Sequence, residues 1–164
     1  ETISRLMDSG VFKRTALPVQ LHQSPLLSDA GAQSRETRRA EAWKIFGAAD
    51  RKMRMSTVLV DGGFPVESLP SVHEAVRTGL RALCYFSGLD EAAKQDHEPS
   101  HQILHSRFIA PGLLPENAGA ILARLQESAN DRAEMNDQTA RELHKDASVI
   151  YEHAQIALNK AVLT

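Results

Sequence analysis

Cysteine is nearly absent from this sequence, because Cys84 is the only one among 164 residues. A lone thiol forms no internal disulfide and no zinc site with several cysteine ligands, which excludes a disulfide-stabilised scaffold. No apolar run reaches the roughly 18 to 20 residues that cross a bilayer, and no secretory hydrophobic region stands near the beginning. We therefore expect a cytoplasmic protein that does not span a membrane, with Cys84 as a buried, inert thiol.

Aromatic residues and an excess of one charge are also lacking. Aromatic side chains make up 5% of the chain, whereas 42% of it is hydrophobic. Nineteen basic and 21 acidic residues give a net charge of −2, which does not favour nucleic-acid binding by the whole surface. The basic residues are concentrated early, since residues 1–60 carry ten Lys and Arg against six Asp and Glu. A local basic surface is therefore expected near the beginning of the chain.

Helical periodicity dominates the chain from about residue 35 onward. Six residues, all but Thr57 apolar, recur at steps of three and four over 35–60 and are expected on one helical face: Ala42, Phe46, Ala49, Met53, Thr57 and Val60. Further helices are predicted over 70–87, 100–109, 115–129 and from residue 139 onward, and no stretch alternates with the period of a strand. The sequence therefore predicts an all-α, up-and-down bundle of four main helices with one additional short helix.

Residues with strong positional preferences suggest where these helices begin and end. Ser34 is a suitable N-cap for the first long helix, and Gly62-Gly63 is expected to end it. Pro115 suits the first position of a later helix, and the pattern from Thr139 to Glu142 matches a capping box for the last one. The polar segment 88–99 is predicted to be a loop.

The first 33 residues do not share this regularity. A short helix is predicted before Gly10, and residues 11–33 then show no period but contain two prolines and several apolar residues. We expect an irregular arm that lies on the domain or on a neighbour. The predicted organisation is therefore the end of a preceding module with a linker arm over 1–33, followed by a helical domain over 34–164.

One segment resembles a known family. Phe108 is followed by Gly-Leu-Leu-Pro-Glu at 112–116 and by a helix with Leu122-x-x-Leu125. This arrangement resembles small bacterial members of the HEPN superfamily (higher-eukaryote and prokaryote nucleotide-binding domains), and the likeness extends over about residues 36–162. It implies a four- or five-helix bundle that is often dimeric. Many members are toxins or metal-independent ribonucleases.

The ribonuclease members carry an Arg that is followed, after four to six residues, by a His, and none of the thirteen arginines in this chain is followed by a histidine at that spacing. The nearest pair is Arg141 and His144, with two residues between them. We therefore predict a non-catalytic accessory or interaction domain that needs no cofactor. The alternative is a HEPN toxin, either a metal-independent ribonuclease or a nucleotide-binding protein, with Arg124, Arg132, Arg141 and His144 as its candidate residues.

The first fifteen residues carry a second, shorter resemblance. They look like the end of a catalytic or accessory module that leads into a helical tail, as in bacterial helicase-like ATPases of the Swi/Snf type. The chain begins at Glu1 without an initiator methionine, which suits a C-terminal piece of such a protein. No GxxxxGK[ST] phosphate loop occurs here, so an ATPase would be on other residues. The remaining domains of that larger protein are expected partners.

Two groups of residues are candidates for ligand binding. Arg35, Arg38 and Arg39 could contact a nucleic acid or an acidic partner, the alternative being a solvated helix face. His101 and His105 stand four apart, a spacing that can chelate zinc or nickel on a helix. The alternative for this histidine pair is an exposed polar face, and no metal site is assigned.

The last predicted helix also suggests self-association. It carries small residues at regular positions: Ala147, Ala154, Ala157 and Ala161. Small side chains permit close helix approach, so this stripe is expected to pack within the bundle and at a subunit interface. Apolar residues continue through Val162-Leu163, where either the arm over 11–33 or a second copy is expected to cover them. We predict a dimer.

Overall fold

The computed structural model describes residues 25–94, 99–130 and 135–160 of the chain. Within these ranges it contains helices and no strand, which confirms the predicted all-α bundle. The elements are α2 (Pro25–Asp61), α3 (Pro65–Phe86), α4 (Asp90–Lys94), α5 (His101–Leu104), the π-helical turn η1 (His105–Ile109), α6 (Ala118–Asn130) and α7 (Asp137–Lys160). The chain divides into two compact units, Glu1–Ala32 and Gln33–Thr164, and the side-chain contacts described below all lie within the second.

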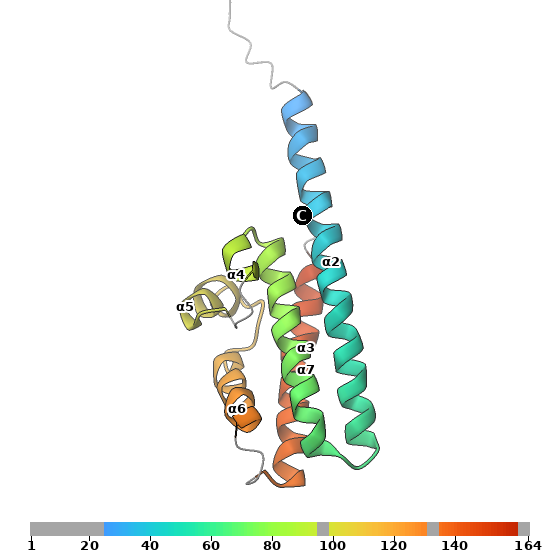
Figure 1. Ribbon diagram of the computed structural model, residues 1–164. Helices are drawn as coiled ribbons and strands as arrows, with labels where there is room; N and C mark the ends of the chain where they lie inside the picture. Colours follow the sequence, from blue (N-terminus) through green and yellow to red (C-terminus); the bar gives the residue numbers. More distant parts are fainter. Residues whose placement is uncertain (1–24, 95–98, 131–134, 161–164) are drawn as a thin grey trace, which may run out of the picture. The chain divides into compact units, whose positions relative to one another are not determined.

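Helix α3 is central within this second unit. It packs against α7 over most of its length, and α2 lies along the same two helices (Figure 1). Helix α6 packs on both α3 and α7, and the short α4 returns to α3. Three long helices therefore form one side of the bundle, while α4, α5 and α6 form the other.

The core is apolar and continuous between the long helices. Its largest fully buried members include Phe46, Leu80, Leu83, Leu143 and Ile150. The Phe46 ring of α2 stacks on Tyr151 of α7 with 5.0 Å between centroids, and it meets Trp43 edge to face at 5.5 Å. Gly79 of α3 lies against the Phe46 ring, which a Cβ there would contact at 3.5 Å. Side chains of α2 and α7 and the backbone of α3 therefore pack together at one cluster of aromatic rings.

Two helices begin earlier than the sequence pattern predicted. Residues 25–33 belong to α2 and are not irregular, so Ser34 lies inside the helix and does not cap it. Helix α3 begins at Pro65, not at residue 70, and Pro70 lies within it. Proline is favoured at a first helical position because its missing N–H would have no partner there. Pro25 and Pro65 open these two helices, whereas Ser34 and Pro70 lie inside them.

The later helix starts also differ from prediction. Part of the segment expected to be a loop, 88–99, forms the short helix α4. Helix α6 begins at Ala118, because Pro115 belongs to a preceding turn whose carbonyl accepts the Ala118 N–H at 3.0 Å. Helix α7 is capped by Asn136, whose Oδ1 accepts the Thr139 N–H at 2.8 Å. The proposed capping box at Thr139 is therefore wrong, and Thr139 lies in the first turn.

The predicted helix ends agree with the structure. Helix α2 stops at Asp61 before Gly62-Gly63, and Gly63 has φ +89°. Helix α3 stops at Phe86, two residues before Gly88 with φ +78°. Glycine reaches these positive φ values without the steric cost of a side chain, so these positions end helices reliably. The predicted short helix at Gly10 lies outside the described residues.

Candidate functional site

A buried polar contact between α2 and α7 joins Ser56 to His144. Ser56 Oγ lies 3.0 Å from His144 Nε2, and it also lies 2.7 Å from the carbonyl oxygen of Met53. The serine hydroxyl has one hydrogen, which it donates to the shorter contact with that carbonyl. We therefore assign the Nε2–H tautomer to His144, with Nε2 donating to Ser56 Oγ. In this arrangement the imidazole is neutral and its Nε2–H is satisfied.

Burial controls the charge state of His144. Its side chain is 9% exposed, and loss of solvation lowers the pKa of the imidazole, although the nearby charge of Asp61 acts in the opposite direction. Ser56 is completely buried. A serine beside a histidine is the pattern of nucleophilic catalysis, but this hydroxyl is closed to substrate and is occupied by two contacts. The pair therefore serves to join α2 to α7.

The other candidate catalytic residues make separate contacts. Arg141 is exposed and donates from Nη1 to the carbonyl of Val60 at 3.2 Å, which ties α7 to the end of α2. Arg124 of α6 forms a 3.7 Å ion pair with Asp146 of α7. No hydrogen bond or ion pair joins Arg124, Arg141 and His144 to one another in the described part of the chain. Arg132 lies outside the described residues.

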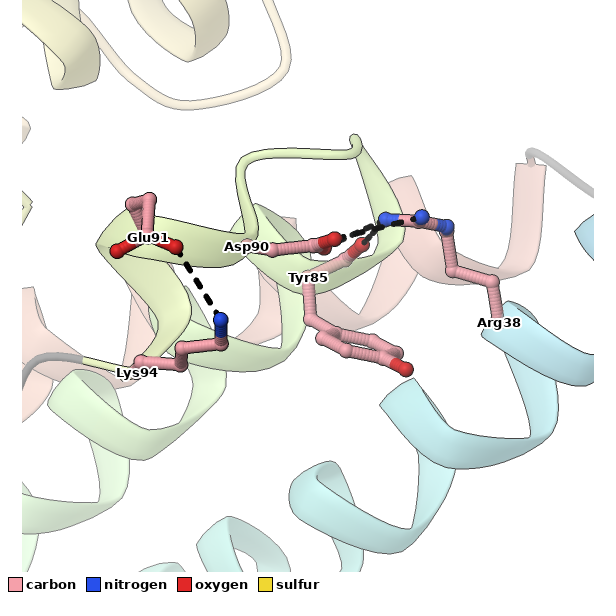
Figure 2. A network of polar contacts seen from close by, with 5 residues as sticks. All are labelled: Arg38, Tyr85, Asp90, Glu91 and Lys94. Carbon is pink, nitrogen blue, oxygen red and sulfur yellow. Dashed lines mark hydrogen bonds and ion pairs between the residues drawn. The ribbon is translucent and has the colours of Figure 1, made fainter.

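The three arginines of α2 that were predicted to bind a partner, Arg35, Arg38 and Arg39, differ in their surroundings. Arg38 binds the Asp90 carboxylate at 2.6 Å and donates to the carbonyl of Tyr85 at 3.2 Å, while its guanidinium lies 5.4 Å from the centre of the Tyr85 ring (Figure 2). These contacts attach α2 to the turn between α3 and α4. Arg35 is exposed and Arg39 is half-buried. Of the three predicted binding residues, Arg38 has a structural partner that sequence reasoning did not identify.

The histidine pair lies on α5 and η1. His101 and His105 are exposed, with ring centroids 6.4 Å apart and planes at 18°. Among the residues described, no group of three or more His, Cys, Asp or Glu side chains could hold a metal ion. The carboxylates at 96 and 98 and the histidine at 97, which precede the pair in sequence, lie outside those residues. The pair is thus a two-nitrogen arrangement at the surface.

Further polar groups stabilise contacts between the long helices. Glu74 of α3 forms 2.6 Å ion pairs with both Lys52 of α2 and Arg77. Burial acts to raise the pKa of Glu74, but the hydrogen bonds from these two cations outweigh it and leave that pKa below its usual value. Tyr151 donates to Asp50 at 3.0 Å, and burial together with this bond raises the pKa of Tyr151. Sequence reasoning missed the Lys52–Glu74 and Asp50–Tyr151 contacts, because each joins residues far apart along the chain.

Cys84 lies in the interior of the bundle, where its environment disfavours chemistry. It is completely buried in α3, and burial raises the pKa of the thiol to about 11. The thiolate is the nucleophilic form of cysteine, so a raised pKa makes this group unreactive near neutral pH.

The small residues of α7 face inward. Ala147, Ala154 and Ala157 are all buried in the core, whereas Ala161 lies outside the described residues. The prediction that this stripe also reaches a subunit interface is therefore wrong for the three described alanines, because helices of the same chain already cover them. Close helix approach, which small side chains permit, is used here for packing within the bundle.

The exposed large apolar side chains occupy a different surface. They are Met55 and Val58 on α2, Phe64 in the following turn, and Val149 and Ile156 on α7. Among the side chains described, none of this kind stands on α3, α4, α5, η1 or α6. Among the described residues, the exposed large apolar groups are therefore confined to α2, the turn after it and α7.

Comparison with protein-family models, with curated proteins and with solved structures finds no significant match for this chain. Within the described residues, no helix combines the length and the apolar character that crossing a membrane requires.

Proposed function

We propose that this chain is a non-catalytic helical interaction domain. The observation that carries the proposal is that the exposed large apolar residues of the described chain stand only on α2, the turn after it and α7. Exposed apolar patches mark surfaces that contact other proteins. The charge of the chain, −2 overall, does not favour general binding to nucleic acid.

The contacts of the candidate catalytic residues support the same proposal. His144 is held neutral and buried against Ser56, and Arg141 is bound to the backbone of α2. A ribonuclease needs a general base and a cation that reach the same phosphate and 2′-hydroxyl. In this chain the imidazole is closed to solvent while the guanidinium is exposed, so the two groups do not present one joint surface.

The resemblance to HEPN domains places this proposal in a wider setting. Accessory domains of that kind serve a larger protein, and we propose the same for this chain, with a helicase-like ATPase as the larger protein. That last element rests on the likeness of residues 1–15, which lie outside the described residues. Under this proposal the partners are the other domains of the larger protein and a second copy of the chain.

RNA cleavage distinguishes the interaction domain from the toxin. The purified chain and an R141A/H144A variant are incubated with a mixed-sequence RNA in the presence of a chelator. We expect no cleavage by either protein, because the histidine is buried and already bonded. Cleavage by the original chain that disappears in the variant would overturn the proposal and establish the ribonuclease. Circular dichroism of both proteins checks that the variant retains its helices.

A binding titration examines the basic residues separately. Labelled single-stranded RNA is titrated with the original chain and with an R35E/R39E variant. We expect weak binding that disappears at moderate salt, since few phosphates could be contacted. The matched control is R38A, which removes a cation already paired with Asp90 and should leave RNA binding unchanged. Tight, salt-resistant binding that R35E/R39E abolishes would instead make nucleic acid the partner.

A further inference from the structure

The outer face of α7 carries a regular stripe that no part of the described chain covers. Lys145, Val149, Glu152 and Ile156 are all exposed. Their steps of four, three and four residues keep them within about 60° of one another around the helix and spread them over about 16 Å. Two apolar residues thus alternate with one positive and one negative residue along a single line. We call these four residues the α7 outer stripe.

The two charges of this stripe have no partner among the described residues. The side chains of Lys145 and Glu152 form no hydrogen bond or ion pair in that part of the chain. Their neighbour Asp146, one position further around α7, does pair with Arg124 of α6. The stripe therefore combines exposed apolar groups with two opposite charges that no described side chain pairs, so a partner of complementary charge can bind to it.

The order of these residues is complementary to itself. Lys145 and Glu152 are two helical turns apart, and the midpoint between them lies beside Val149. If two α7 helices pack antiparallel about a two-fold axis at that midpoint, each Lys145 faces Glu152 of the second copy. Val149 then lies against its own counterpart at the axis. In a symmetric contact of this kind every interaction occurs twice.

The same register accommodates the fourth residue of the stripe. Ile156 falls opposite Arg141 of the second copy, whose guanidinium is held by the carbonyl of Val60. The aliphatic stem of an arginine fixed in this way offers an apolar surface. Two charges of the same sign at positions 145 and 152 would face each other in this arrangement, and such contacts are unfavourable. The charge order of α7 thus favours a second copy of this chain as the occupant.

We propose that the chain forms a symmetric homodimer through antiparallel packing of the α7 outer stripe. This inference deepens the proposed interaction function and rests on it. It differs from the interface predicted on the alanine stripe, which is buried within the bundle. A single pair of helices buries little area, so the dimer is expected to dissociate on dilution in the micromolar range, on the order of weak protein complexes.

Charge reversal on the full chain tests this register by sedimentation equilibrium over a dilution series. K145E and E152K each replace two attractive contacts by two repulsive ones, and we expect each to raise the dissociation constant about tenfold. The double variant K145E/E152K restores both pairs with exchanged signs, so its dissociation constant should return close to the original value. The matched controls are R107E on η1 and E127K on α6, which change the net charge equally at exposed positions outside the stripe.

A cross-link tests the position of the axis. V149C places a thiol beside its counterpart in the second copy, so a short bismaleimide should yield a covalent dimer. V58C, on the outer face of α2, has an exposed side chain of similar kind and should yield much less. The natural Cys84 is buried and does not compete.

Three results would overturn the proposal. They are a monomer at every concentration with helices intact, dissociation constants of K145E and E152K equal to those of R107E and E127K, and a double variant no better than the single ones. The proposed interaction function survives all three, because the other domains of the larger protein remain as its partners. That function is contradicted separately by histidine-dependent RNA cleavage.

Discussion

The inner face of α7 packs into the core of the bundle, whereas its outer face is exposed. The inner face carries alanines and large aliphatic residues, and Ile150 in the middle of it is completely buried. The outer face alternates charged and apolar residues, and Ile156 there is 47% exposed. Small residues at regular spacing therefore mark where the bundle packs on itself. The surface available to a partner is recognised by exposed apolar groups beside unpaired charges.

The largest difference between the two faces should appear in stability. I150A removes a buried side chain from the core and is expected to reduce the free energy of unfolding by about 2 to 5 kcal/mol. I156A removes the same atoms from an exposed position and should change it by less than about 0.5 kcal/mol. Urea unfolding measures both losses when the protein concentration is kept below the dissociation constant of the dimer. Equal losses in the two variants would contradict the assignment of the faces.

Dimer formation should be affected by I156A and not by I150A, the reverse of their effects on stability. Because Ile156 belongs to the outer stripe, I156A should weaken the dimer although it leaves the fold intact, whereas I150A should leave association of its remaining folded fraction unchanged. Sedimentation of both variants under the same conditions makes this comparison.

A smaller effect is expected where α7 begins. Asn136 accepts a backbone N–H in the first turn, so N136A should cost about 1 kcal/mol of stability. T139A is the control, because Thr139 is not the cap. If T139A were the more costly substitution, the capping box expected from the sequence would be the correct description after all.

The helices themselves could be predicted because their apolar residues recur with the helical period. Phe46 and Leu80 are examples, since each lies on a predicted apolar face and is buried in the core. The starts were harder, because Pro25, Pro65 and Asn136 compete with other residues that are also common near helix ends. Local preferences of similar strength cannot rank such alternatives without the packing that decides between them.

The polar contacts could not be predicted in the same way. Ser56 and His144 are 88 residues apart, and Arg38 and Asp90 are 52 apart. Their partnership depends on which helices become neighbours, and periodicity does not specify that. Asp90 also lay in a segment expected to be a loop, which hid its role. The sequence did indicate Arg38, Arg141 and His144 as candidate functional residues, but it did not predict their contacts within the bundle.

The Arg38–Asp90 pair provides an intermediate case between a buried and an exposed contact. The two side chains are 33% and 42% exposed, so solvent screens their attraction. A double-mutant cycle of R38A and D90A should give a coupling energy of about 0.2 to 1 kcal/mol that falls as salt is added. A coupling that persists at high salt would mean that the packing of Arg38 on Tyr85, not its charge, holds this turn.

The contribution of His144 to the pH dependence of stability should appear as a small difference between the original chain and an H144Q variant. Burial lowers the pKa of its imidazole below the usual histidine value of 6.5, so the unfolded chain binds a proton more readily than the folded one. This contribution to stability is complete above that value and is lost as the pH falls through it toward the folded pKa. H144Q can still donate to Ser56 but does not titrate. Between about pH 7.5 and pH 5.5 the original chain should therefore lose more stability than H144Q.

An equal loss in H144Q would mean that other groups, such as the Glu74 carboxylate, account for the acid sensitivity. The pKa of Glu74 is lowered by its two cations, so its contribution is present above the pKa of an unfolded glutamate and is lost only at lower pH. The two windows are separate, which allows the histidine effect to be recognised in unfolding curves measured at several pH values.

The distinction between the two sides of the bundle is tested most directly by amide NMR spectra recorded over a dilution series. We predict concentration-dependent shifts for α7 residues from 145 to 156 and for their immediate neighbours, with the amides of α5, η1 and α6 unchanged. Shifts that are centred on α5, η1 or α6, or spectra that stay identical at all concentrations, would contradict the account.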